Sequence, residues 1–273
     1  MSYQVLNGNT IVFSNGVAKR IDEAATRRNK NARILCIFED GARLLRLDDD
    51  YYRMSHIYPD YKTMKRLPDF YDTSALTTMA AMFFGCRALE DISALASIDV
   101  SHVKNLDWAF GLCKSLRNIS PLASWQTTNV ERLYQTFHRC WLLSEVSALS
   151  AWDVSSLKVL NDAFFGCLSL RSVSGIANWD VSKMIFMDET FAGCEELLDL
   201  SPLENWDVSH VVSMERILEN CPAENPWGLT QIPEGTRFGS GSLVAPDDWC
   251  WQRLAKYTDY PDYPPEKGYT TAN

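Results

Sequence analysis

Apolar residues in the middle of the chain recur with a period of 27 residues. Cysteine marks this period at Cys86 and at every 27th position up to Cys221. A phenylalanine stands three residues before each of the first five cysteines, and a leucine stands three residues after each of them. A chain that keeps one period without insertions is a stack of similar supersecondary units. The pattern therefore predicts a solenoid of about six units over residues 67–222.

Within one unit, the apolar spacing predicts a strand, a turn and a short helix. Leu89–Leu95 reads as a short strand that ends in a turn, and the serine at position 93 recurs in every later unit, which suggests a bond to the neighbouring unit's backbone. A Ser/Thr column beginning at Ser101 can cap a helix with Val103 and Phe110 on its apolar face. A second short strand in that place stays open, because periodicity does not decide at this length.

The segment before the repeats does not show the 27-residue period. Tyr3–Leu6 and Thr10–Phe13 surround an Asn-Gly turn, which predicts a hairpin, and Val17–Arg33 reads as a helix. Arg33–Phe38 and Arg43–Leu47 read as two strands.

The domain organisation follows from these patterns. Residues 1–66 are expected to form an α+β cap, because an open solenoid end exposes apolar surface. Residues 223–273 are expected to form a short C-terminal cap, with a helix over Asp247–Tyr257, followed by a Tyr/Pro-rich tail. The predicted fold class is α/β, a capped solenoid.

The repeated motif also resembles a known family. Trp179-Asp180-Val181-Ser182, followed by Met187, Phe191, Cys194 and Leu197, is similar to the unit of the BspA-type leucine-rich-repeat family. The resemblance covers residues 67–222. It implies a right-handed leucine-rich solenoid used for protein recognition, and many family members are surface proteins that carry secretion signals.

Charge and hydropathy narrow the functional classes. The net charge is −9, and residues 67–222 hold 10 basic against 20 acidic residues, which disfavours direct binding of nucleic acid and is compatible with a partner that has a basic surface. The sequence contains no run of about 18 apolar residues and no secretory signal at Met1. We therefore expect a cytoplasmic protein without a membrane segment.

Motifs for catalysis or metal binding are not found in the sequence. There is no Cys-x-x-Cys pair, and the four histidines are scattered, so zinc is not expected. The cysteine column fits small buried thiols. No phosphate loop and no Gly-x-Ser-x-Gly motif occurs. We expect no enzyme activity, no cofactor and no metal.

Candidate binding residues are those that break the repeat. In a solenoid, constant columns are structural and variable columns face water or a partner. Large aromatic residues in variable columns are candidate anchors of an interface. They are Trp108, Tyr134, Trp141 and Phe186. The alternative is that each side chain folds over a neighbouring unit.

A second candidate surface is the predicted strand face. Its outward column would suit Lys and Arg on a partner. The candidates in this column are Asp91, Asn118, Glu145 and Asp199. A solvated sheet face explains them equally well.

These patterns favour a non-catalytic solenoid that binds one protein partner inside the cell, with a monomer as the expected state. Neutralisation is a use that suits a small binder, as an immunity protein against a toxin or an inhibitor in phage counter-defence. The alternative is an exported surface or host-interaction module with an adhesin-like role. An enzyme housed in residues 1–66 is the third, less favoured reading.

Overall fold

The computed structural model describes residues 3–6, 8–13, 17–28, 34–39, 43–46, 53–58, 60–68 and 70–227. Nearly all of the expected C-terminal cap and tail, including the helix predicted at Asp247–Tyr257, lies outside the described residues.

The predicted hairpin is present at the N-terminus. Strands β1 (Tyr3–Leu6) and β2 (Thr10–Phe13) pair antiparallel, with Leu6 opposite Thr10. The helix expected over Val17–Arg33 is wrong in extent: β3 (Ala18–Arg20) pairs with β2, and α1 covers only Glu23–Arg28. The open edge of β2 supplies backbone partners to residues 18–20, and the Asp22 carboxylate then caps α1 by accepting the N–H of Ala25 at 2.8 Å.

A second small sheet leads into the repeats. Strands β4 (Ile34–Ile37) and β5 (Arg43–Arg46) lie where the sequence predicted two strands, and they pair antiparallel. Strand β6 (Phe70–Asp72) then pairs parallel with β5. The short helix α2 (Met54–Ile57) lies between β5 and β6 in the chain, and Met54 is fully buried in the core of the repeats.

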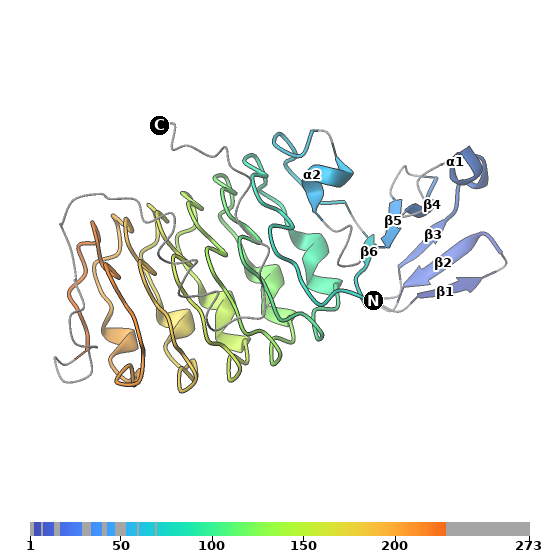
Figure 1. Ribbon diagram of the computed structural model, residues 1–273. Coiled ribbons are helices and arrows are strands. Elements are labelled where there is room, and N and C mark those ends of the chain that lie inside the picture. Colours follow the sequence, from blue (N-terminus) through green and yellow to red (C-terminus); the bar gives the residue numbers. More distant parts are fainter. Residues whose placement is uncertain are drawn as a thin grey trace. The chain divides into compact units, whose positions relative to one another are not determined.

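From Leu76 to Cys221 the chain winds into regular 27-residue coils, here called rungs (Figure 1). Alternate N–H groups donate to carbonyls 26 residues further along the chain, such as Ala81 to Asp107 at 2.8 Å. The intervening N–H groups bond within their own rung, as Met82 does to Met79. This alternation recurs between successive rungs and holds their backbones together.

The helix predicted around Val103–Phe110 is absent, and turns occupy its place in the described rungs. Trp108 has a φ of 60°, and every residue of its column has a φ between 51° and 60°. A second left-handed column runs from Gly85 to Asn220. Left-handed residues at a fixed position interrupt an α-helix. The alternative prediction, a second short strand, agrees better with the structure. Isolated parallel bridges join Asn105 to Arg132 and continue along that column.

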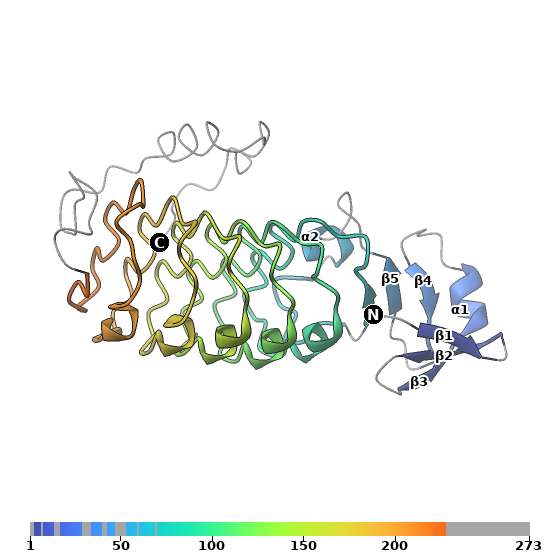
Figure 2. The ribbon, with the colours of Figure 1, turned by 90° about the horizontal axis from the view of Figure 1, so that it is seen from below.

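The opposite part of each rung forms a 3-10 helix. These are η1 (Ser93–Ser97), η2 (Ser120–Ser124), η3 (Ser147–Ala151), η4 (Ser174–Ile176) and η5 (Ser201–Leu203). Figure 2 shows them following one another along one edge of the stack. The sequence predicted a short strand just before each of these helices. In the described residues, that position holds only isolated parallel bridges, such as the one between Glu145 and Ser172.

Stacked side chains fill the interior of the rungs. Phenylalanine rings stack from Phe83 to Phe191 with centroids 5.1–5.8 Å apart, and tryptophan rings stack from Trp125 to Trp206 at 5.9–6.4 Å. Each of these indole N–H groups donates to a carbonyl of the preceding rung, at 2.9–3.2 Å. The cysteine column consists of free thiols that are buried except for the half-buried Cys221, which confirms their predicted packing role.

Candidate functional site

Two of the four aromatic candidates lie inside the molecule. Tyr134 is 5% exposed and Phe186 is 2% exposed. The backbone of Phe186 takes part in the column of parallel bridges, pairing with Val159 and Ser213. Variation in a column therefore does not by itself place a side chain at the surface.

Trp108 fills a gap left by a glycine. Its ring lies against Phe84 and His138, with centroids 5.2 Å from each. A Cβ at Gly111 would come within 2.8 Å of the Trp108 ring. The indole thus takes the place that a side chain at position 111 would occupy between Phe84 and His138, and Trp108 is half-buried. This is the sideways packing that the sequence left open as an alternative.

Trp141 is the aromatic candidate that reaches the surface. Its side chain is 38% exposed. The ammonium of Lys114, one rung earlier in the same column, lies 3.6 Å from the centre of the indole ring. A cation at this distance over a tryptophan face is attracted by the ring quadrupole. An exposed aromatic group and a half-buried cation therefore lie together on this part of the surface.

Three of the four strand-face candidates have a local structural role. Asp91 and Asp199 accept the N–H of the serine two residues later, each at 2.8 Å, and Asn118 does the same for Ser120. These bonds to Ser93 and Ser201 lower the pKa of the two carboxyls, since they stabilise the charged form. Asn118, Glu145 and Asp199 are exposed, and Asp91 is half-buried.

The recurring serine that follows these residues stays within its own rung. Ser93 donates both its N–H and its hydroxyl to the Asp91 carboxylate. The expected bond from this serine to the neighbouring rung is thus replaced by a turn that starts the 3-10 helix.

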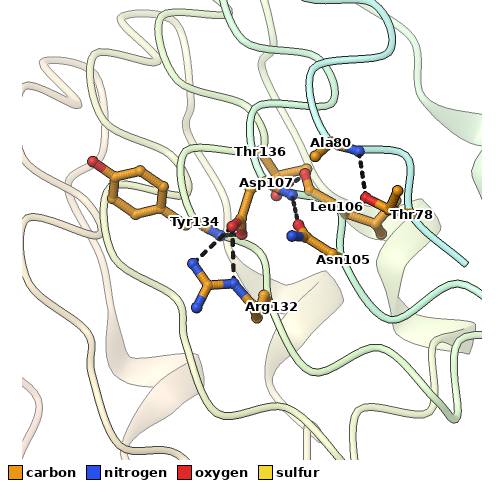
Figure 3. Close-up of polar contacts among 8 residues, drawn as sticks. All are labelled: Thr78, Ala80, Asn105, Leu106, Asp107, Arg132, Tyr134 and Thr136. Atoms are coloured by element: carbon orange, nitrogen blue, oxygen red, sulfur yellow. Dashed lines mark hydrogen bonds and ion pairs between the residues drawn. The ribbon is translucent and has the colours of Figure 1, made fainter. Parts of the chain in front are cut away.

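A buried ion pair lies on the bridge side of the rungs (Figure 3). The Arg132 guanidinium contacts the Asp107 carboxylate through Nε at 2.8 Å and Nη2 at 2.7 Å. The other oxygen of Asp107 accepts the N–H of Tyr134 at 2.9 Å. Figure 3 shows the Tyr134 ring turned away from this pair. Burial raises the pKa of Asp107 in spite of Arg132, so desolvation outweighs the attraction.

Further along the same side, carboxyls outnumber cations. Asp188 accepts the amide of Asn161 and the hydroxyl of Ser213, and Glu189 pairs with Arg216. Desolvation and the neighbouring Glu189 raise the pKa of Asp162 well above its ordinary range. No group of three or more potential metal ligands is found in the described part of the chain.

A family profile identifies the repeats. The profile described as "Mycoplasma protein of unknown function, DUF285" matches residues 52–173 and 133–227. The chain belongs to this DUF285 family. The matched region of the DUF285 protein contains every full rung, α2 and all four aromatic candidates.

Other comparisons add no relatives to the DUF285 assignment. No curated protein and no solved structure matched the chain. Among the described residues, no helix has the length and apolar character needed to cross a bilayer.

The sequence analysis did not identify two features of the rungs. The Asp107–Arg132 pair joins two variable columns, and 25 residues separate its members. Lys114 precedes Trp141 by one period, so a search for cations one repeat away from an aromatic candidate could have found it.

Proposed function

We propose that this DUF285 protein is a BspA-type leucine-rich solenoid that binds one protein partner and has no chemistry of its own. In this proposal it is a right-handed leucine-rich solenoid of about six rungs, capped at both ends. It acts as a monomer inside the cell. Partner binding uses variable columns on a framework whose constant columns are internal.

One observation carries the proposal: Trp141 is exposed on a framework that otherwise buries its tryptophan ladder. The ladder residues from Trp125 to Trp206 are at most 5% exposed, whereas Trp141 is 38% exposed. Exposed tryptophan is enriched among the residues that dominate binding energy at protein interfaces. The backbone bonds between rungs hold the position of Trp141, so little ordering entropy is lost on binding.

Neutralisation is the use that we propose for such a binder. A rigid body with one recognition surface can occlude the active surface of a toxin, as an immunity protein does. It can equally block a defence protein, as a phage inhibitor does. Both uses need only tight binding, which is the property that the framework supports.

Affinity capture with matched variants tests the proposal. The full chain is compared with Trp141→Ser and with Leu198→Ser, a control that also removes an exposed apolar side chain, since Leu198 is 73% exposed. Circular dichroism first establishes that the variants are folded. We expect one partner to be captured by the wild type and by Leu198→Ser, and to be lost with Trp141→Ser. Failure of the wild type to retain any protein would contradict the proposal.

An exported role as a surface module is the second candidate, because many proteins of the BspA-type family are surface proteins. A protease-protection assay on intact producing cells separates the two locations. Degradation of the protein by external protease would favour the exported module, and full protection would favour action inside the cell.

A further inference from the structure

One column of the rungs forms a ridge with a graded character. It comprises the residue that follows each buried cysteine, together with Lys62 on the preceding turn. The residues of this ridge are Lys62, Arg87, Lys114, Trp141, Leu168 and Glu195. Backbone hydrogen bonds place its members on adjacent turns. The residue after Arg87 donates its N–H to the Lys62 carbonyl at 3.2 Å, and the residue after Lys114 donates its N–H to the Arg87 carbonyl at 3.1 Å. Along the stack, the ridge changes from basic to apolar and then to acidic.

The cations of the ridge have no ion-pair partner among the residues that the structure describes. Within the described residues, no carboxylate forms an ion pair with Lys62, Arg87, Lys114 or the adjacent Arg139. Elsewhere on the rungs, cations such as Arg132 and Lys158 have a carboxylate within 3 Å. Cations that no described carboxylate pairs with, gathered on a body with excess negative charge, form a local positive site.

These cations also repel one another. Desolvation lowers the pKa of Lys114, and the positive charges of Arg87 and Arg139 lower it further. An anion placed over the ridge would relieve this repulsion. Lys114 already covers one face of the Trp141 ring, so an anion at Lys114 would lie beside an exposed aromatic surface.

The step between rungs suits an extended peptide. Stacked rings in the interior are 5.1–6.4 Å apart from one rung to the next. In an extended strand, residues i and i+2 face the same side about 6.6 Å apart. Alternate side chains of an extended segment can therefore contact successive members of the ridge.

We propose that the ridge binds an extended acidic segment of a protein partner. Alternate carboxylates of that segment face Lys62, Arg87 and Lys114, and an apolar side chain two positions further on contacts Trp141 and Leu168. This inference rests on the proposed protein-binding function and names the partner's chemistry, which is acidic rather than basic. Nucleic acid fits less well, because its phosphates would continue past Trp141 toward Glu195 and Glu196.

A peptide-binding assay on the full chain tests the inference. The probe is a fluorescent peptide of about nine residues with Glu at three alternate positions followed by Leu, which spans the ridge when extended. Lys114→Glu reverses one charge on the ridge. Lys183→Glu is the matched control, since Lys183 is an exposed cation whose charge acts on Asp153 and Asp180 instead.

We expect anisotropy titrations at low salt to show binding by the wild type and by Lys183→Glu within twofold. Lys114→Glu should weaken binding by about fivefold or more, because an attraction becomes a repulsion. Binding should also fall as salt approaches about 150 mM. The inference is overturned if the wild type ignores the peptide, if both variants behave alike, or if a single-stranded oligonucleotide binds more tightly and is lost with Lys114→Glu.

The affinity capture described above keeps the two proposals apart. A partner retained by wild type and by Lys114→Glu alike would preserve protein binding and overturn the acidic ridge ligand. A wild type that captures no partner would contradict the protein-binding function itself.

Discussion

Replacing Arg132 by methionine should destabilise the protein strongly. The two side chains of the Asp107–Arg132 pair are only 12% and 11% exposed, and two nitrogen–oxygen contacts shorter than 3 Å join them. Methionine keeps most of the packing of the arginine stem but leaves Asp107 without its counter-charge. Removing one partner of a buried pair costs about 3–5 kcal/mol. We expect a loss of this size in the free energy of unfolding near neutral pH.

The double variant Asp107→Asn/Arg132→Met serves as the control. Asparagine can still accept the N–H of Tyr134, and neither buried charge remains. The raised pKa of Asp107 indicates that burying its charge costs at least as much free energy as the attraction to Arg132 returns. The ion pair as a whole therefore adds little to the free energy of unfolding. The double variant should therefore lie within about 1–2 kcal/mol of the wild type.

Urea unfolding followed by circular dichroism measures these differences at two pH values. Protonated Asp107 needs no counter-charge, so the loss caused by Arg132→Met should shrink as the pH falls through the raised pKa of Asp107 in the folded protein. A loss below about 1 kcal/mol that does not change with pH would refute the reasoning, because Asp107 would then be solvated.

Three further perturbations test the framework by thermal or urea unfolding. Trp152→Phe leaves the carbonyl of Leu122 without its 2.9 Å indole bond and should cost about 1–3 kcal/mol; an unchanged midpoint would argue against that bond. Gly175→Ala should cost about 3 kcal/mol or more, since the new Cβ would lie 2.1 Å from the Val146 carbonyl oxygen, and a neutral result would mean that the backbone yields freely. The raised pKa of Asp162 means that its contribution to stability is largest when the carboxyl is protonated and falls as pH rises through that pKa. Asp162→Asn should therefore stabilise the protein near pH 7 but not below about pH 4, and equal effects at both would contradict the assigned pKa.

The interior of the repeats was predictable because each ladder repeats one residue type in one environment. The column of Phe137 and the column of Trp152 each stack on their own kind, so period and residue type together place the side chains. The hairpin of β1 and β2 was predictable for a different reason, since the Asn-Gly signal in the sequence is local.

The path of the backbone was not predictable from the apolar spacing. Val103, Leu106 and Phe110 have the spacing of a helix, but Trp108 between them is left-handed. The N–H of Trp108 donates to the Tyr134 carbonyl of the next rung, so bonds between rungs override the local preference. No single repeat contains the information about this partner.

The candidate site could be predicted only in part. Trp141 lies at the surface on the column where variation placed it, whereas the equally variable Phe186 is buried. Residue types can also vary along a buried column when the side chains packed around it vary as well. The sequence alone does not distinguish such a buried column from an exposed one. Whether cations one period apart lie close together depends on the distance between rungs. The sequence gives the period of 27 residues but not that distance.

Photo-crosslinking from position 141 in producing cells tests partner binding most directly. A photoreactive phenylalanine analogue replaces Trp141 in the full chain, and the same analogue at Leu198 serves as the control, since both side chains are exposed. The account predicts one crosslinked protein from position 141, with the attachment next to alternating acidic residues, and no such product from position 198. Crosslinks from position 198 alone, or none from either position, would contradict it.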